Sequence, residues 1–513
     1  MTDIDGNLVS TGLDSSGSAT LSISRGTSIT LSGTISVSFS AGIATFSNLA
    51  ITGLAQTQVQ LMVTVAPWVN HFPSTSIFAV NPGIAARLVQ AGLEPSSLSA
   101  GTTPSNNMVI AAKDAYNNDT TVPADTIITY SIVDSADTSV VRRVVGTSTL
   151  SAGATSVTLG RAQFRITESG TYKIKFTTTQ YPDVFTREFT IKNAAAYRLV
   201  LTQDMPSTVS SGVTFSPALK AQVLDEFGNP VLDSVTTVSL AVVVGSGRTL
   251  SSATFSNLLG SSYVEFDSLS ITGSSGATKL RLTGRVAGVA LTGGTVDTAQ
   301  FNLGAGTAYA LSISPTALNV ANRNTLSNIV VSVVDASGNV IPDSVAQITA
   351  SVSGIALSGT NIRFASAGVT TFSDLVLSGA TGTYNLGLTS TGLVGATVSV
   401  TVTHGQASYI TLTSSATAKN AQNLTAQPVA RIFDADGNLV TTGAQSTQTV
   451  RLSVTGATLS GTAAISASAG VATFSGISLQ GLVGSKTLTA EVSLPATLSA
   501  NVSVALDFGN VTR

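Results

Sequence analysis

The chain has 513 residues, a formal net charge of −2 and only 10% charged residues, although its hydrophobic share of 43% is close to that of an ordinary globular protein. The scarcity of basic residues argues against nucleic-acid binding, and the absence of cysteine excludes disulfides and thiolate metal sites. The mean hydropathy is +0.37, yet no stretch reaches the run of about 18 apolar residues that a membrane-spanning helix requires.

A short polar motif, Asp-x-x-Gly-Asn, recurs along the chain, with Asp-Ala-Tyr-Asn-Asn as a degenerate second copy. The five copies are Asp3–Asn7, Asp114–Asn118, Asp225–Asn229, Asp335–Asn339 and Asp434–Asn438, and successive asparagines are 111, 111, 110 and 99 residues apart. Glycine supplies positive φ, and Asp and Asn bond to nearby backbone, so each copy predicts a turn between two strands. The structural turn residues predicted in the three middle copies are Asp114, Asn118, Asp225, Gly228, Asn229, Asp335, Gly338 and Asn339.

A second motif runs in phase with the first. Copies of Gly-x-x-Thr-Phe-Ser begin at Gly42, Gly368 and Gly470, and the alternating apolar tails that follow them end at Gly53, Gly379 and Gly481. The third repeat keeps the tail, which ends at Gly273, and the second repeat departs most from the pattern. Two motifs that share one period of about 100 residues indicate a tandem array of domains.

Between these motifs, apolar and polar residues alternate, as in residues 449–454, and β-branched residues are frequent. Clusters of Pro, Gly, Asn and Asp interrupt the runs about every 8–12 residues, a spacing typical of antiparallel sandwiches. The chain is therefore predicted to be all-β, a tandem array of immunoglobulin-like β-sandwich modules. The predicted core phenylalanines, one in each module, are Phe46, Phe164, Phe266, Phe372 and Phe474.

We place the module boundaries at short Ala/Gly-rich steps. The predicted modules are 1–83, 84–193, 194–304, 305–404 and 405–513, the second being divergent and the last including the start of a further linker. Because short linkers restrict motion between domains, we expect the modules to form an extended, semi-rigid rod.

Module 1 differs from the others because its turn already begins at Asp3, whereas a segment long enough for two strands precedes the turn in modules 2 to 5. We expect module 1 to lack its first two strands and to be the least ordered module. A fragment of a longer protein would explain this arrangement. The alternative is that another chain supplies the strands, as in donor-strand pairing.

Residues that could support catalysis are sparse. The two histidines, His71 and His404, lie in different modules, and no module offers an obvious carboxylate pair or phosphate-binding glycine loop. We therefore expect no enzyme activity and no cofactor. The densest aromatic spot, Trp68 with Phe72, suits packing better than carbohydrate stacking.

Calcium is the best chemical candidate, because two copies of the turn place oxygen ligands at alternate positions. These residues are Asp3, Asp5, Asn7, Asp434, Asp436 and Asn438. The Glu expected at position twelve of a calcium-binding loop is replaced by Asp14 in one copy and by Gln445 in the other. A structural turn explains all five copies and is preferred, with calcium kept as the alternative.

The repeats resemble bacterial immunoglobulin-like modules of invasin- and intimin-like surface proteins. The matching residues are the turns from Asp335 to Val340 and from Asp434 to Val440, and the strand from Gly470 to Phe474. The likeness covers nearly the whole chain, and module 2 least. It implies a non-catalytic stalk, in an extracellular or cell-surface location, that holds a terminal domain away from the cell.

Three functions follow as hypotheses. The first is a stalk or spacer segment of a large secreted or cell-surface adhesin-like protein. The second is a self-associating extracellular structural protein such as a surface layer, sheath or fibre, for which the low charge suits lateral packing. The third is an accessory array of a secreted polysaccharide-active enzyme. The expected partners are neighbouring modules, other copies of the chain, and a host surface or glycan, with no nucleic acid and no membrane insertion.

Overall fold

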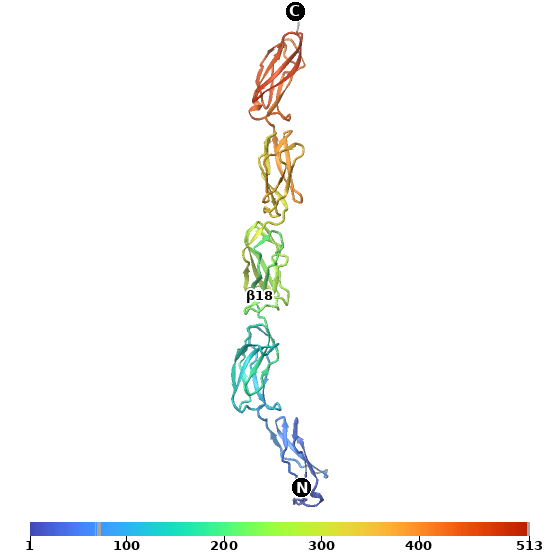
Figure 1. Cartoon of the computed structure of the whole chain (residues 1–513), viewed down its shortest axis with the longest axis vertical. Helices are drawn as coiled ribbons and strands as arrows, with labels where there is room; N and C mark the ends of the chain where they lie inside the picture. The colour runs from blue at the N-terminus through green and yellow to red at the C-terminus, as the bar shows by residue number, and fades with distance from the viewer. Residues whose placement is uncertain (67, 69–72, 510–513) are drawn as a thin grey trace.

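The structure is a computed structural model that describes residues 1–66, 68 and 73–509. It consists of β-sandwich bodies that follow one another in a single elongated rod, with the N- and C-termini at opposite ends (Figure 1). Apart from three short 3-10 turns, the regular elements of the described residues are strands. No helix among these residues has the length and apolar character to cross a membrane.

Module 5 shows the complete pattern. Its elements are β37 (Ala407–Thr413), β38 (Thr417–Lys419), β39 (Val429–Asp434), η3 (Ala444–Thr447), β40 (Thr449–Thr455), β41 (Thr458–Ser460), β42 (Ala464–Ser466), β43 (Val471–Thr473), β44 (Ser478–Gln480), β45 (Gly484–Ser493) and β46 (Thr497–Asp507). One sheet has the order β38-β46-β45-β40-β42 and faces a second sheet, β37-β39-β43, while β41 pairs with β44. Apart from the parallel pair β38–β46, neighbouring strands are antiparallel. This arrangement is an immunoglobulin-like β-sandwich.

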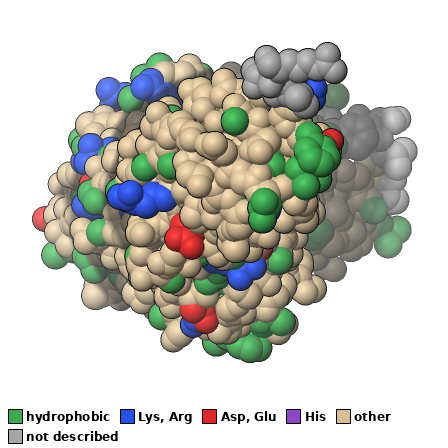
Figure 2. Space-filling model, turned by 90° about the horizontal axis from the view of Figure 1, so that it is seen from above, with side chains coloured by type: hydrophobic (Ala, Val, Ile, Leu, Met, Phe, Trp, Pro, Cys, Tyr) green, Lys and Arg blue, Asp and Glu red, His purple; other side chains and the backbone are tan. Residues whose placement is uncertain are grey.

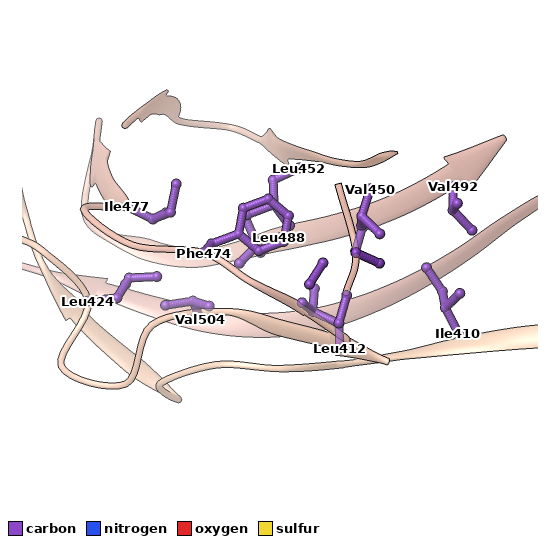
Figure 3. Close-up of a cluster of buried hydrophobic side chains, with 14 of the residues drawn as sticks. Ile410, Leu412, Leu424, Val450, Leu452, Phe474, Ile477, Leu488, Val492 and Val504 are labelled. Atoms are coloured by element: carbon purple, nitrogen blue, oxygen red, sulfur yellow. The ribbon is translucent and has the colours of Figure 1, made fainter. Parts of the chain in front are cut away.

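The core of module 5 lies between its two sheets, as Figure 3 shows. Strand β45 alternates across its length, so that Leu488, Ala490 and Val492 point into the core while Thr487 and Glu491 are exposed. Phe474 fills the centre and is 1% exposed. Because the module has no disulfide, apolar packing holds the two sheets together.

Module 4 repeats this topology strand for strand, with sheets β28-β36-β35-β30-β32 and β27-β29-β33 and the pair β31–β34. Its strands are β27 (Ala310–Ser314), β28 (Ala317–Ala321), β29 (Ile329–Val334), β30 (Gln347–Ser351), β31 (Ala356–Ser358), β32 (Ile362–Phe364), β33 (Val369–Phe372), β34 (Val376–Ser378), β35 (Gly382–Thr389) and β36 (Ala396–Thr403). The fold prediction is confirmed here: the chain is all-β and its modules are immunoglobulin-like sandwiches in an extended rod.

Modules 2 and 3 vary the same plan. Module 2 contains β7 (Arg87–Ala91), β8 (Leu98–Ser99), β9 (Met108–Lys113), β10 (Thr126–Asp134), β11 (Val141–Leu150), β12 (Ser156–Leu159), η2 (Arg161–Phe164), β13 (Gly170–Thr177), β14 (Val184–Phe185) and β15 (Phe189–Lys192). Module 3 contains β16 (Ala196–Gln203), β17 (Thr208–Ser210), β18 (Lys220–Asp225), β19 (Thr236–Val244), β20 (Arg248–Leu250), β21 (Thr254–Ser256), β22 (Tyr263–Glu265), β23 (Ile271–Gly273), β24 (Gly276–Val286), β25 (Val289–Asp297) and β26 (Phe301–Gly304). Each module has its own core of buried apolar side chains.

Module 1 is the smallest sandwich. It contains η1 (Leu13–Ser15), β1 (Ser18–Arg25), β2 (Ile29–Ser32), β3 (Ser36–Ser38), β4 (Ala50–Gly53), β5 (Gln56–Ala66) and β6 (Phe78–Val80). Its sheets are β3-β1-β5-β6 and β2-β4, so it has no described counterpart of the β37-β39-β43 sheet. In module 5, three strands (β37 to β39) lie before the Asp434–Asn438 turn, and the last of them ends at Asp434. The sequence predicted two strands in this segment. The additional strand, β38, has only three residues, too few for alternation to reveal it.

Candidate functional site at the joints between modules

Each Asp-Asn turn is closed by its own aspartate. In module 5, Asp434 Oδ1 accepts hydrogen bonds from the N–H groups of Asp436 at 3.0 Å and Asn438 at 2.9 Å. Asn438 Nδ2 donates to Asp434 Oδ2 at 2.9 Å, and Gly437 adopts a φ of +84°. The degenerate copy in module 2 places Asn117 at the corresponding left-handed position, with a φ of +73°, which asparagine tolerates better than most residues. The residue types of the motif therefore follow from the geometry of the turn.

The same aspartates also hold the linkers. In modules 2 to 5, the second carboxylate oxygen accepts the N–H of the residue that enters the module. These bonds join Gly83 to Asp114 at 2.9 Å, Ala194 to Asp225 at 2.8 Å, Gly306 to Asp335 at 2.8 Å and Gly405 to Asp434 at 2.8 Å. One carboxylate thus fixes both the turn and the incoming chain.

The asparagine of each turn reaches across the joint to the preceding module. Its Nδ2 donates to a carbonyl and its Oδ1 accepts an N–H two residues further on. The four pairs are Asn118 with Gly53 O (3.0 Å) and Ala55 N (2.8 Å), Asn229 with Thr167 O (2.7 Å) and Ser169 N (2.9 Å), Asn339 with Gly273 O (2.8 Å) and Ser275 N (2.7 Å), and Asn438 with Gly379 O (2.8 Å) and Thr381 N (2.8 Å). We call this two-bond contact the amide clamp, and the segments 53–55, 167–169, 273–275 and 379–381 the acceptor loops.

The joint between modules 4 and 5 has additional side-chain contacts. Asn322, which follows β28, donates to Asp434 Oδ2 at 3.0 Å and to Asp436 Oδ2 at 2.6 Å. The guanidinium of Arg323 binds both oxygens of Asp436, with Nε to Oδ2 at 2.8 Å and Nη2 to Oδ1 at 2.6 Å. Asn322 Oδ1 also accepts the N–H of Gly379, so this one side chain connects the acceptor loop to the turn.

The other joints have different contacts in addition to the amide clamp. Between modules 3 and 4, the hydroxyls of Ser211 and Ser337 are 3.2 Å apart. Between modules 2 and 3, the guanidinium of Arg165 lies 5.5 Å from the ring centre of Phe227, a cation–π contact. Among the described residues of modules 1 and 2, the hydrogen bonds across the joint are those of the Asn118 clamp and those that Gly83 of the linker makes with Asp114 and Thr120.

Two acceptor loops are fastened to their own modules by a tyrosine. Tyr384 Oη donates to Ala380 O at 2.8 Å, in the middle of the loop that receives Asn438. In module 2, the hydroxyl of Tyr172 lies 3.2 Å from Glu168 O and 3.4 Å from Ser169 O. These tyrosines act as the corner residues of the sandwich. They fix the backbone groups that the next module binds.

The joint aspartates are buried but remain charged. Burial opposes ionisation of Asp434, but hydrogen bonds from Gly405, Asn438 and Asn322 outweigh it and lower the pKa of Asp434 to about 2. The same balance, burial against the bonds from Asn118 and Gly83, lowers the pKa of Asp114 to about 2. Charge-assisted hydrogen bonds of this kind are stronger than neutral ones.

The same carboxylate atoms are the ligands that the calcium hypothesis requires. Within the described ranges, no group of three or more His, Cys, Asp or Glu side chains is arranged to hold a metal ion. Both oxygens of Asp434 and both of Asp436 accept hydrogen bonds from protein groups. A calcium ion would have to displace the Arg323 guanidinium from Asp436. At Asp434 and Asp436 the carboxylates therefore serve the joint itself, and calcium at these residues and at Asp3, Asp5 and Asn7 stays a prediction.

Four of the five predicted core phenylalanines are buried, since Phe164, Phe266, Phe372 and Phe474 are each at most 1% exposed. Phe164 lies in the 3-10 turn η2 and not on a strand. Phe46 departs from the expectation, because it is only half-buried and lines an open cavity of about 920 Å³ together with Phe39 and Val63. The physical reason is that the described residues of module 1 include no counterpart of the β37-β39-β43 sheet that covers Phe474.

Of the two histidines, only His404 lies within the described residues. His404 lies at the joint between modules 4 and 5, where its Nε2 accepts the N–H of Thr442 at 3.1 Å. His71 and Phe72 lie outside the described residues. Trp68 is 40% exposed.

Sequence reasoning missed the contact that defines the joints. The acceptor loops at Gly53, Gly273 and Gly379 are the glycine-terminated tails of the second motif, and the turns of the first motif bind them. The sign of this contact in the sequence was that the two motifs repeat with the same period, so each module carries one turn and one acceptor loop. Asn322 recurs in module 5 as Asn420, which makes the same bond to its own loop glycine. Arg323 does not recur there, since Ala421 follows Asn420, so the sequence offered no sign of the role of Arg323.

No protein-family model matches the chain, and no curated protein matches it by sequence. Among solved structures, it is similar to the Escherichia coli adhesin FdeC, with 18% identity, 63% of this chain and 100% of that chain covered, and a TM-score of 0.29. It is also similar to extracellular cadherin domains 1–4 of protocadherin gamma B7, with 12% identity, 80% and 99% covered, and a TM-score of 0.32. The human desmocollin-1 ectodomain is 10% identical, with 96% and 93% covered and a TM-score of 0.29. At these scores the likenesses say nothing of function.

Proposed function

We propose that the chain is a non-catalytic spacer that keeps its two ends apart by holding successive modules in fixed orientations. The observation that carries this proposal is the amide clamp, which recurs at four joints with the same two bonds to the preceding module. A flexible tether would need long linkers and no contacts between modules. Here each linker is itself bonded to a buried aspartate.

The proposed setting is the stalk of a bacterial secreted or cell-surface protein of the adhesin type. The repeat resemblance to bacterial immunoglobulin-like modules supports this setting. The polar, weakly charged surface also suits it, since Ser and Thr on the strands' outer faces favour β-structure. The repeat family, the bacterial source and the location belong to this proposal, as do the module boundaries given above.

A variant without clamps tests the spacer function. Replacing Asn118, Asn229, Asn339 and Asn438 by alanine removes the eight bonds across the joints and leaves every module core intact. We expect unchanged circular dichroism but a broader distribution of end-to-end distances in small-angle X-ray scattering, with a shorter mean.

The matched control replaces four exposed asparagines that lie away from the joints: Asn106, Asn361, Asn385 and Asn501. This control should scatter like the original chain. If the variant without clamps also keeps the full rod dimension, the clamps do not set module orientation and the proposal is wrong.

A further inference from the structure

We propose that one side of module 4 binds the same side of a second copy of this chain, so that two rods associate side by side at this module. The surface consists of the exposed side chains of Val345, Ile362 and Phe364, and we call it the apolar edge. It lies between two filled joints, so it is the same surface whatever modules precede or follow. The inference is independent of the spacer function, because a rod that stays alone keeps its own joints.

Strand β32 of module 4 places its side chains the opposite way round from the equivalent strands of modules 3 and 5. In β42 of module 5, Ile465 points inward against the core, while Ala464 and Ser466 are exposed. In β21 of module 3, the inward residue is Phe255. In β32, the same register position is taken by Arg363. A core position therefore carries a charge in this module alone among the three.

The inward arginine is neutralised within the module. Arg363 Nη2 lies 3.1 Å from Asp374 Oδ1, and the guanidinium carbon lies 6.0 Å from the ring centre of the buried Phe372. Successive side chains of a strand point to opposite faces, so an inward Arg363 forces Ile362 and Phe364 outward. An arrangement that costs desolvation and removes apolar groups from the core is expected where a surface has a function.

The apolar edge faces solvent. The exposed fractions of its side chains are 72% for Val345, 44% for Ile362 and 66% for Phe364. Val345 lies beside the strand, because the carbonyl of the following Ala346 accepts the N–H of Ala365 at 2.9 Å. At the same three positions, module 5 has small or polar exposed residues: Thr447, Ala464 and Ser466.

The backbone of β32 is also open on one side, since the strand stands at the end of its sheet, beside β30. Asn361 O and Ala365 N, on either side of β32, form backbone bonds of 2.7 Å and 2.9 Å towards β30. Bonded and free positions alternate along an antiparallel strand, so Arg363 also bonds to β30. The N–H and C=O groups of Ile362 and Phe364 therefore point away from the sheet, where a further strand can bind them.

This edge is complementary to itself. When two β32 strands run antiparallel about a two-fold axis at Arg363, Ile362 of each copy lies opposite Phe364 of the other. The four outward N–H and C=O groups of each copy then bond across the axis, and an aromatic ring faces a β-branched side chain twice, a favourable cross-strand pair. Both copies use the same patch, as in the commonest symmetric dimers.

Charge does not oppose the contact. Residues 305–404 include five charged side chains, of which two serve the joints and two form the ion pair of Arg363 with Asp374. The fifth, Asp343, is exposed. Figure 2, which looks along the rod, shows few and scattered charged side chains on the face in view. Surfaces with so little charge associate without strong repulsion and with little desolvation of ions.

The geometry of the sheet sets the shape of the pair. The strands of module 4 run broadly along the rod (Figure 1), and adjacent strands of a sheet are rotated by about 20–25° relative to each other. Two rods joined through β32 are therefore antiparallel and cross at about this angle, so their other modules diverge. The contact is confined to one module, and association through so small an area is weak and reversible.

An exchange of residues between modules tests the apolar edge. The triple variant Val345→Thr, Ile362→Ala, Phe364→Ser gives module 4 the residues that module 5 has at these positions. The measurement is sedimentation velocity of the full chain, up to about 1 mM because contacts of this size bind weakly. We expect the sedimentation coefficient of the original chain to rise with concentration, and the association constant of the triple variant to be about tenfold lower.

Two matched controls replace exposed apolar residues of module 3. Val289→Thr and Leu258→Ser change side chains that are 71% and 79% exposed, and both should associate like the original chain. Phe364→Lys alone places a charge on the open edge and should also reduce association about tenfold. This single exposed substitution covers the case in which the triple variant disturbs its own module.

Cross-linking tests the antiparallel register, since the chain has no cysteine of its own. A mixture of Ile362→Cys and Phe364→Cys chains should form disulfide-linked pairs, whereas each variant alone should form few, because only paired positions reach a Cα separation of about 4.4–6.8 Å. Electron microscopy should show the linked rods crossing at module 4.

Three results would overturn the proposal. The first is a sedimentation coefficient of the original chain that stays constant with concentration. The second is association of the triple variant at the level of the original chain. The third is cross-linking of each cysteine variant alone as efficient as that of the mixture.

Discussion

Modules 1 and 5 share both repeated motifs, yet the motifs have different surroundings in the two modules. Phe474 is enclosed between two sheets, whereas Phe46 lines an open cavity. The turn at Asp434 is held by Asn322 and Arg323 of the preceding module, whereas Asp3 bonds only within its own turn among the described residues. The difference shows that neither motif is self-sufficient, because the phenylalanine depends on strands β37 to β39 and the turn depends on the module before it.

The largest expected effect concerns the different burial of Phe474 in module 5 and Phe46 in module 1. Phe474→Ala should destabilise module 5 by about 3–5 kcal/mol, because it removes a fully buried ring from a packed core. Phe46→Ala should cost only about 1 kcal/mol, since that ring is already partly in water. Hydrogen exchange with mass spectrometry reports each module separately and can measure both losses. Equal losses in the two variants would contradict the comparison.

The joints between modules 1 and 2 and between modules 4 and 5 should respond differently to the same substitution. Each clamp asparagine leaves two backbone groups without partners when replaced by alanine, a loss of about 1–3 kcal/mol. Asn118→Ala should broaden the range of orientations between modules 1 and 2. Asn438→Ala alone should leave modules 4 and 5 in their original orientation, because Arg323 still binds Asp436, and the double variant with Arg323→Ala should lose that orientation. Distances between spin labels across each joint measure this, and the chain's lack of cysteine makes labelling site-specific. Arg451→Ala, an exposed arginine away from the joints, is the control.

Acid should loosen the joints through their aspartates. Because the pKa values of Asp114 and Asp434 are lowered from 3.8 to about 2, their contribution is complete above pH 3.8 and is lost as the pH falls towards about 2. The rod dimension in X-ray scattering should therefore be constant from neutral pH down to about pH 4 and decrease below that. In Asp434→Asn, the joint between modules 4 and 5 should keep only the acid dependence that comes from Asp436, because Arg323 also lowers the pKa of that carboxyl. Loosening already at pH 6 would point to a different group.

The smallest expected effect is that of calcium. Since Arg323 and Asn322 already bind the carboxylates of Asp434 and Asp436, millimolar calcium should leave the melting temperature of module 5 unchanged. Differential scanning calorimetry with calcium and with a chelator measures this. A rise in melting temperature that disappears in Asp436→Asn would restore the calcium interpretation.

Alternation and turn chemistry are local properties, and for that reason the sequence predicted the all-β fold, the repeat and the positions of the turns. The amide clamp joins residues far apart along the chain, since Asn438 and Gly379 are separated by 59 positions and Asn339 and Gly273 by 66. Nothing local marks Gly379 as a binding partner. The burial of Phe46 could not be predicted either, because it depends on which strands cover it and not on its own motif.

Each module from 2 to 4 has an Asp-Asn turn at one end and an acceptor loop at the other, so both halves of the interface are encoded within one repeat. Recombination between repeats that removes or duplicates one whole module therefore produces a new junction in which the amide clamp can form at once, although the supplementary contacts differ from joint to joint. The length of the rod can change by whole modules in a single genetic event, without a second mutation to repair the interface. The length of the rod can thus evolve separately from the rigidity of its joints.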